Sequence, residues 1–166
     1  MDVGLKKLLK KSSKLRDSDV LLYICKNKKI KKYLKKKHKK LREKFIKFLK
    51  GYKSKIVSLN KTKEEISIDR CRKILSESFL NKNDKELHKI RIEVKKCRYT
   101  SQNEKILKKI QDYLGLAHDY YNCEKLLNKF GLNTKKAIKK KQKFIKKAEK
   151  SRIKFLNQIS ILHSSL

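Results

Sequence analysis

Four basic residues recur at helical spacing between Leu87 and Tyr99, namely His88, Arg91, Lys95 and Arg98. On a helical wheel at about 100° per residue they form one stripe. Apolar side chains flank the stripe on both sides, so it occupies the middle of the face that should be buried. Because unpaired buried charge is costly, we expect a wet, cationic cavity or channel between helices that an anion fills.

The residue types on this stripe are suited to phosphate. Arg91 and Arg98 supply planar forks that match phosphate oxygens, whereas Lys95 acts as a point charge. His88 is the pH-sensitive member, because bound phosphate favours its protonated form. Tyr99 can donate a hydrogen bond from the rim. The segment therefore predicts a phosphate-binding helix.

Three further predicted helices carry polar residues within their apolar faces. These are His38 and Arg42; Gln111, His118, Asn122 and Lys125; and Lys141, Arg152 and His163. A histidine on an apolar face is by itself more often a core residue than a ligand. His88, His118 and His163 could in principle hold a metal ion, but the surrounding cations would repel it. We therefore expect neither a metal nor a cofactor.

The composition agrees with an anionic partner. The chain has 166 residues with 50 Lys+Arg and 16 Asp+Glu, a net charge of +34, which opposes compaction unless an anion offsets it. A membrane span needs about 18 consecutive apolar residues, and no such run exists. With no proline and four glycines, a β-rich fold or a Pro/Gly-rich disordered chain is not expected. The composition thus favours an all-α protein that binds a polyanion.

The cysteines and the N-terminus bear on the compartment. Cys25, Cys71, Cys97 and Cys123 are too widely spaced for the close pairing of a zinc site, and we expect them to be buried, reduced thiols. The N-terminal segment is basic and amphipathic, but it lacks the apolar stretch of a signal peptide. We therefore expect a cytoplasmic protein.

The chain parses into about six helices with short connections, which favours antiparallel neighbours. Thr62 and Glu65 form a predicted capping box, Asp84 is a predicted N-cap, and Gly131 is a predicted C-cap. Asn133 or Thr134 should cap the last helix. The expected helices cover residues 4–26, 29–57, 62–80, 84–101, 103–130 and 134–162.

The segment ELHKIRIEVKKCRYT resembles the signature helix of the CHAD domain, the conserved-histidine α-helical domain. It contains His88, Arg91, Lys95, Lys96, Arg98 and Tyr99. Downstream, LKKIQDYLGLAHDYYNCEKLL resembles the following helix of that family, and KLRDSDVLL resembles the matching helix of its first half. The resemblance covers most of the chain. It implies an all-helical fold of two pseudo-symmetric halves around a basic cavity that binds inorganic polyphosphate without catalysis.

The two halves differ in length. Arg16 and Asp17 align with His118 and Asp119, but the counterpart of His88 would fall before residue 1. We expect a single CHAD-like domain over 1–166, in which 1–57 is a remnant of the first pseudo-repeat and 62–166 is the second. The first signature helix is missing from this pattern. The cavity should then be open on one side or be completed by a second copy in a homodimer.

The predicted function is non-catalytic binding of inorganic polyphosphate in a trough between helices, with steep salt dependence as for nucleic acids. The predicted ligand-binding residues are His88, Arg91, Lys95, Lys96, Arg98, Tyr99, Arg16, His38, Arg42, His118, Lys125, Lys141 and Arg152.

Other functions stay open. The charge also fits a nucleic-acid-binding protein, although the aromatic residues mostly follow the apolar stripes rather than forming stacking platforms. A polyphosphate hydrolase or kinase would need acidic residues for Mg²⁺ and usually a phosphate-binding loop. Asp17, Asp19 and Asp119 are the candidate inner acids, and no GxxxxGK[ST] motif occurs. A scaffold that targets polyphosphate granules would use the same binding face.

Overall fold

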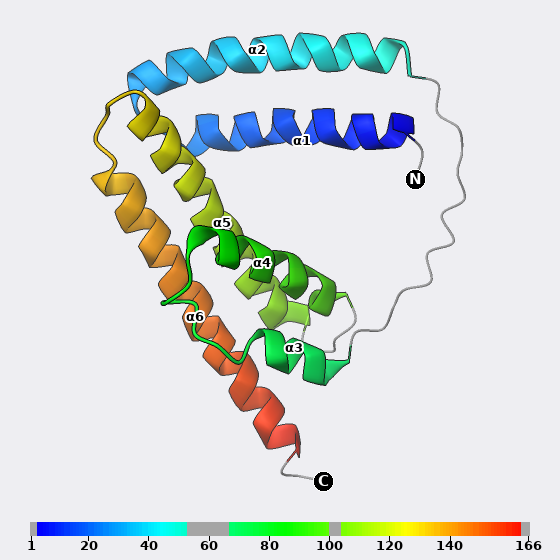
Figure 1. Cartoon of the computed structure of the whole chain (residues 1–166), viewed down its shortest axis with the longest axis vertical. Coiled ribbons are helices and arrows are strands. Elements are labelled where there is room, and N and C mark those ends of the chain that lie inside the picture. The colour runs from blue at the N-terminus through cyan, green and yellow to red at the C-terminus, as the bar shows by residue number, and fades with distance from the viewer. Residues whose placement is uncertain (1–2, 53–66, 100–103, 164–166) are drawn as a thin grey trace. The chain divides into compact units, whose positions relative to one another are not determined.

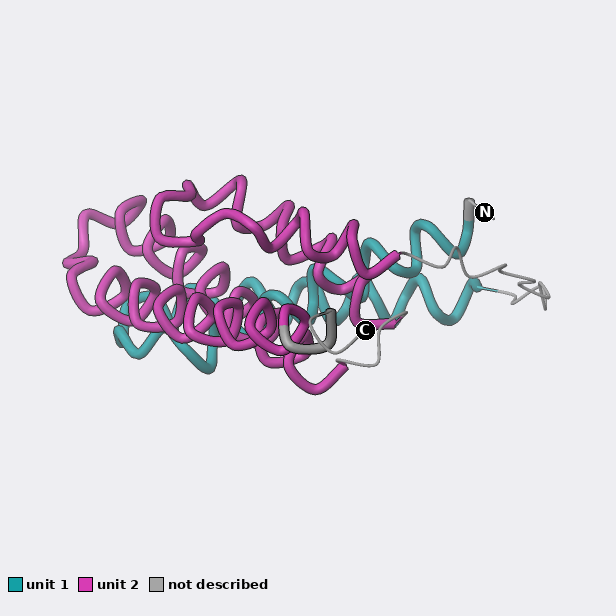
Figure 2. Tube along the Cα trace, turned by 90° about the horizontal axis from the view of Figure 1, so that it is seen from below, with its two compact units in different colours: residues 1–61 teal, residues 62–166 magenta. Residues whose placement is uncertain are grey.

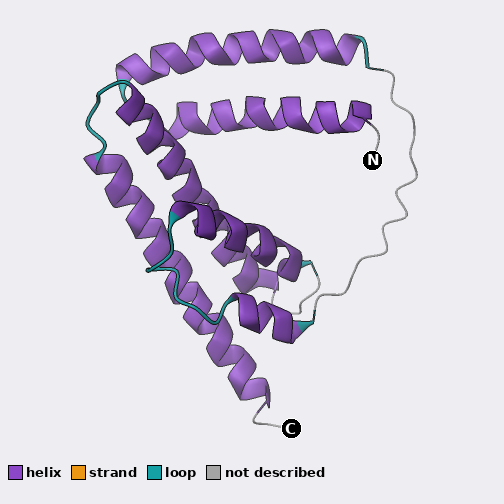
Figure 3. Cartoon of the chain, viewed as in Figure 1, coloured by secondary structure: helices purple, strands orange, loops and turns teal. Residues whose placement is uncertain are grey.

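The computed structural model describes residues 3–52, 67–99 and 104–163. Within these ranges the chain forms six helices and no strand, which confirms the expected all-α fold (Figures 1 and 3). The helices are α1 (Val3–Ile24), α2 (Lys28–Lys50), α3 (Ile68–Ile74), α4 (Asp84–Arg98), α5 (Glu104–Lys129) and α6 (Lys135–His163).

The helices belong to two compact units, residues 1–61 and 62–166 (Figure 2). In the first unit, α1 packs against α2. In the second unit, α5 packs against both α4 and α6, and α3 packs against α4. No helix among the described residues combines the length and the apolar character that crossing a membrane requires.

Local side-chain caps explain where several helices begin and end. The Asn27 side chain accepts hydrogen bonds from the N–H groups of Lys29 and Ile30, which starts α2. The C-cap of α2 is Gly51, so the described helix is shorter than the expected 29–57. The predicted capping box at Thr62 and Glu65 lies outside the described residues.

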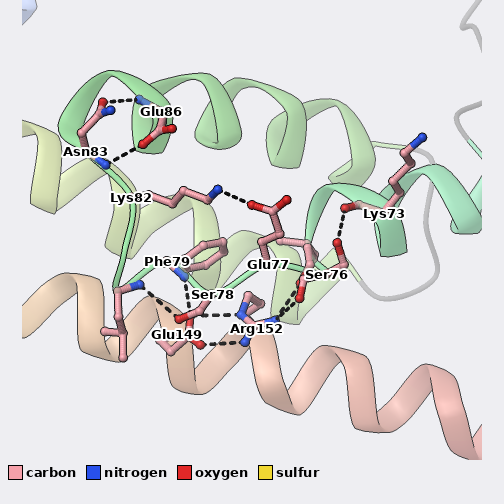
Figure 4. Close-up of polar contacts among 12 residues, drawn as sticks. Lys73, Ser76, Glu77, Ser78, Phe79, Lys82, Asn83, Glu86, Glu149 and Arg152 are labelled. Atoms are coloured by element: carbon pink, nitrogen blue, oxygen red, sulfur yellow. Dashed lines mark hydrogen bonds and ion pairs between the residues drawn. The ribbon is translucent and has the colours of Figure 1, made fainter.

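The start of α4 differs from the prediction by one residue. The N-cap is Asn83, which forms a reciprocal capping box with Glu86, whereas Asp84 was the expected cap. The Glu86 N–H donates to Asn83 Oδ1 at 3.1 Å, and the Asn83 N–H donates to Glu86 Oε2 at 2.7 Å (Figure 4). Asp84 is instead available for a contact with α6, described below.

Gly131 ends α5 as predicted. Its φ of 63° lies in the left-handed region that favours glycine. This turn lets the Leu132 N–H donate to the Leu127 carbonyl at 3.0 Å, which satisfies one of the last carbonyls of the helix. The Asn133 side chain then accepts from the Lys135 N–H at 2.8 Å, at the start of α6.

Helix α3 ends at Ile74, well before the expected Leu80, because side chains of α6 bind the backbone groups that would continue the helix. In a longer helix the Phe79 N–H would donate to the Leu75 carbonyl. Instead, the Phe79 N–H donates to Glu149 Oε2 at 2.9 Å, and the Leu75 carbonyl accepts from Arg152 at 2.8 Å (Figure 4). These two tertiary hydrogen bonds therefore satisfy the donor and the acceptor that one helical hydrogen bond would have joined.

The apolar core of the second unit lies between α3, α4, α5 and α6. Its largest fully buried side chains include Phe79, Leu107 and Phe155. Cys71 of α3 and Cys97 of α4 are also fully buried, but a disulfide joins them, with a Cα–Cα distance of 5.8 Å. Among the described residues no cysteine is a free thiol, so the expectation of reduced cysteines is wrong. The reason is tertiary, since these two cysteines meet only when α3 packs on α4.

Candidate anion-binding site

The predicted ligand-binding residues of α4 differ in how deeply they are buried. Leu87, Val94 and Cys97 are buried against the core, and this anchors the helix. His88, Arg91 and Arg98 are half-buried beside them, as the wheel predicted, whereas Lys95, Lys96 and Tyr99 are exposed. The structure therefore places three members of the predicted set on the inner side and three at the rim or outside.

Arg98 has the most defined surroundings in this set. Its side chain is 15% exposed, and its guanidinium carbon lies 4.4 Å from the centre of the Tyr99 ring. A cation over an aromatic face is held in place by the ring quadrupole. The nearest carboxylate is Glu104, whose Oε1 lies 4.0 Å from Arg98 Nε, which is too long for a hydrogen bond. Tyr99 thus positions the fork of Arg98 without consuming its donors.

Several buried polar atoms on α4 and α5 have no hydrogen-bond partner among the described residues. They are His88 Nδ1, Arg91 Nε and Arg98 Nε on α4, and Gln111 Oε1 on α5. Leaving such an atom unsatisfied costs about 1–3 kcal/mol, so a cluster of them in a native protein requires an explanation. Three of the four atoms lie on positively charged or protonatable side chains, which indicates an anionic ligand.

Helix α5 faces the stripe with a second histidine. The rings of His88 and His118 have centroids 4.6 Å apart and are tilted by 37°. The centroid of the His118 ring is 6.2 Å from that of Tyr121. Lys125 is exposed, and its Nζ lies 5.3 Å from the centre of the same tyrosine ring. The structure thus brings the predicted residues of α5 next to those of α4. We call His88, Arg91, Arg98, Gln111 and His118 the α4–α5 site.

A metal site is not assembled within the described residues. They contain no group of three or more histidine, cysteine, aspartate or glutamate side chains that could hold an ion. The side chain of His163, the third histidine considered, lies outside the described residues.

Lys141 of α6 contacts both α4 and α5, but two carboxylates neutralise its charge. Its Nζ lies 3.1 Å from Asp84 Oδ2 and 2.9 Å from Glu124 Oε2. Burial alone would lower the pKa of Lys141, but the hydrogen bonds and charges of the two carboxylates outweigh this effect and raise it. Lys141 therefore joins α6 to α4 and α5, and we expect a smaller contribution to ligand binding than its position in the sequence suggested.

Arg152 is buried away from the α4–α5 site and has a structural role instead of the expected ligand-binding one. Its guanidinium donates to both Glu149 oxygens, at 3.0 and 2.6 Å, and to the carbonyls of Leu75 and Ser76, at 2.8 and 3.2 Å (Figure 4). Burial would raise the pKa of Glu149, but hydrogen bonds from Arg152, the Phe79 N–H and Ser78 lower it. The i, i+3 spacing of Glu149 and Arg152 is the sequence signal for this pair.

The remaining predicted residues, Arg16, His38 and Arg42, belong to the first unit. His38 Nε2 of α2 lies 2.7 Å from Asp19 Oδ1 of α1, and this contact joins the two helices. Arg16 and Arg42 are exposed. Outside the stripe, Lys96 of α4 is also paired, with Glu93 Oε1 at 2.6 Å from its Nζ.

Fold and site together define a small, strongly basic helical protein with a half-buried basic stripe between two packed helices. No family model, curated protein or solved structure matches the chain. The likeness to the CHAD domain therefore stays a prediction that depends on the motifs quoted above.

Proposed function

We propose that the chain binds inorganic polyphosphate at the α4–α5 site and does not cleave it. The observation that carries this proposal is the row of buried donors without partners, above all Arg91 Nε and Arg98 Nε. A phosphate oxygen supplies the acceptors that these N–H groups lack, and a negative charge offsets the two guanidinium groups.

The length of the stripe favours a chain of phosphates over a single ion. From His88 to Arg98 the helix rises about 15 Å, at 1.5 Å per residue. A lone phosphate can satisfy only one part of such a stripe, whereas linked phosphates can satisfy all of it. Polyphosphate carries about one negative charge per phosphate, so its binding should release counterions and weaken steeply with salt. The exposed Lys95 would attract the chain as it enters.

Changing Arg91 and Arg98 together to glutamine tests the site. Each charge-assisted hydrogen bond contributes about 1.5–3 kcal/mol, so we expect the double variant to bind long-chain polyphosphate at least about 100-fold more weakly at fixed salt. The readout is a titration of fluorescently labelled polyphosphate at constant ionic strength.

The matched control changes Lys85 and Lys89 to glutamine. These residues are exposed on the same helix, so the control removes the same charge without touching the stripe. We expect less than a threefold loss for it. Equal affinity of the Arg91/Arg98 variant and the unchanged protein would contradict the site assignment.

Two further measurements separate the rival functions. Incubation with polyphosphate and Mg²⁺ or Mn²⁺ should release no phosphate, and release would favour an enzyme. Duplex DNA at equal charge concentration should not displace polyphosphate from the α4–α5 site, and full displacement would favour a nucleic-acid-binding protein. With both results as expected, the role to study in cells is association with polyphosphate granules.

A further inference from the structure

A second basic surface lies on α6, separate from the α4–α5 site. Nine residues of this helix form one continuous surface: Lys135, Lys136, Lys139, Lys140, Gln142, Lys143, Lys146, Lys147 and Lys150. On a helical wheel these positions follow one another without a gap over about 160°. They extend for about 22 Å along the helix axis, at 1.5 Å per residue. We call this surface the α6 lysine face.

The charge of the α6 lysine face is not neutralised. Seven of its eight lysines are exposed, and Lys140 is half-buried. Within the described part of the chain, these lysines form no ion pair with a carboxylate. The acidic residue of this stretch, Glu149, is buried beside the edge of the face, where it binds Arg152. The face therefore presents continuous positive charge to solvent.

Packing on the other side holds the face rigid. Ala137, Ala148, Phe155 and Ile159 of α6 are buried. At the edge of the face, Lys147 Nζ lies 5.6 Å from the centre of the Tyr113 ring of α5. Since α6 is packed along α5, it can present its lysines to a partner without ordering a new segment.

From this geometry we infer that the α6 lysine face binds duplex DNA through its phosphate backbone, without reading the base sequence. The major groove of B-form DNA is about 12 Å wide, close to the diameter of about 10–12 Å of a helix with its side chains. A helix in that groove has a row of phosphates on each side. Lysines spread over about 160° reach both rows, whereas a single linear polyanion would meet only those along one edge.

The residue types on the face favour backbone binding over base recognition. It contains no arginine, and Gln142 at its edge is the one amide side chain. Lysines on flexible stems act as point charges and bind phosphates without fixed geometry. Duplex RNA should bind more weakly, because its deep, narrow major groove does not admit a helix. The inference uses none of the residues of the α4–α5 site, so either proposal can fail without the other.

Helix α2 provides the comparison within the same chain. It is also rich in lysine, but Glu43 and the exposed Ile46 interrupt its basic surface. Four of its exposed lysines, Lys32, Lys36, Lys39 and Lys47, match in number and type four exposed lysines from the two sides of the α6 lysine face, namely Lys135, Lys136, Lys146 and Lys147. Changing either set to glutamine removes the same net charge and keeps good helix formers.

The experiment measures binding of a 20-base-pair duplex DNA by fluorescence anisotropy at several salt concentrations, with full-length protein. Each lysine–phosphate contact adds about 0.9 to the slope of log K against log salt. The α6 variant should therefore lose up to about 3.6 from this slope and bind at least tenfold more weakly at 0.1 M salt. The α2 variant should lose less than about 1, and circular dichroism should show unchanged helicity for both.

Three outcomes would overturn the inference. The first is an equal loss of slope in both variants, which would show that only bulk charge matters. The second is tighter binding of a duplex RNA of the same length. The third is the absence of measurable DNA binding by the unchanged protein. Polyphosphate affinity, measured in parallel, should fall with the Arg91/Arg98 variant and stay within threefold for the α6 variant, which keeps the two sites distinguishable.

Discussion

At the scale of single residues, two arginines of the same unit have opposite surroundings. Arg152 makes four hydrogen bonds, to the Glu149 carboxylate and to two backbone carbonyls. Arg91 is half-buried, and its Nε has no hydrogen-bond partner within the described residues. The first arginine stabilises the fold, whereas the second costs stability and keeps a donor available. This contrast is what a binding residue and a structural residue should show.

Changing each arginine to methionine separates these roles. Arg152→Met leaves Glu149 buried and unpaired, which should lower the free energy of unfolding at pH 7 by about 3–5 kcal/mol. Arg91→Met removes an unsatisfied buried N–H and should change stability by less than about 1 kcal/mol in either direction. Urea unfolding followed by circular dichroism measures both. A large loss for Arg91→Met would contradict the view that this side chain is held ready for a ligand.

The pH dependence of stability provides a check on the Glu149–Arg152 ion pair. The pKa of Glu149 is lower in the folded chain than in the unfolded chain, so its stabilising effect is present above the ordinary glutamate range. That effect is lost as pH falls through the folded value. The stability difference between the Arg152→Met variant and the unchanged protein should therefore shrink below about pH 4. A constant difference down to pH 2 would count against a charged pair.

At the scale of elements, the helix α4 that carries the site is fixed from both ends and from one side. The capping box of Asn83 and Glu86 starts it, and Lys141 of α6 binds Asp84 in its first turn. Near its other end, Cys97 is joined to Cys71 of the short helix α3. Cys97 precedes Arg98 directly, so the disulfide holds the part of α4 that presents the Arg98 guanidinium.

Removing this disulfide should loosen the unit. For a cross-link of sequence separation 26, the chain-entropy account gives about 3 kcal/mol of stabilisation. We expect the Cys71→Ser variant to unfold at a lower temperature by about 6–12 °C, since each kcal/mol corresponds to roughly 2–4 °C at this size. Calorimetry under oxidising conditions measures the shift. An unchanged Tm, or peptide mapping without the Cys71–Cys97 link, would show that the bond does not contribute.

At the scale of the whole molecule, positive charge is distributed over surfaces of different character. The basic side chains of the α4–α5 site are few and half-buried, and two of them are arginines. The basic side chains of the α6 lysine face are many and mostly exposed, and all of them are lysines. The net charge of +34 opposes compaction in each unit. Bound polyanions should therefore stabilise the fold as well as occupy the sites.

Polyphosphate should raise the Tm of the protein. A ligand at 100 times its Kd stabilises the folded state by about 2.7 kcal/mol. For a chain of this size that corresponds to an increase of about 5–10 °C. The Arg91/Arg98 double variant should show less than half of this increase at the same polyphosphate concentration. Differential scanning calorimetry measures it, and an equal increase in both proteins would assign the effect to exposed lysines.

The sequence by itself determined the features that depend on neighbours along the chain. Helical periodicity and the absence of proline predicted an all-α chain, and Gly131 ended α5 where expected, because the left-handed turn is a local requirement. The wheel also predicted the half-buried positions of His88, Arg91 and Arg98 on α4, but it was wrong for Lys95, which is exposed. In each case the information lies within one or two turns of the residue concerned.

Only the tertiary structure decided which polar groups find partners. Arg152 looked like a ligand-binding residue on the wheel, but its backbone acceptors are 76 and 77 residues away in the sequence. The same contact ended α3 before Leu80, and the packing of α3 on α4 joined Cys71 to Cys97. The side of a helix on which a residue lies is determined by the nearby sequence. Whether the charge of that residue is neutralised depends on side chains from segments that are distant in the sequence. That physical difference separates Arg152, which is satisfied by the fold, from Arg91 and Arg98, whose Nε groups still lack an acceptor among the described residues.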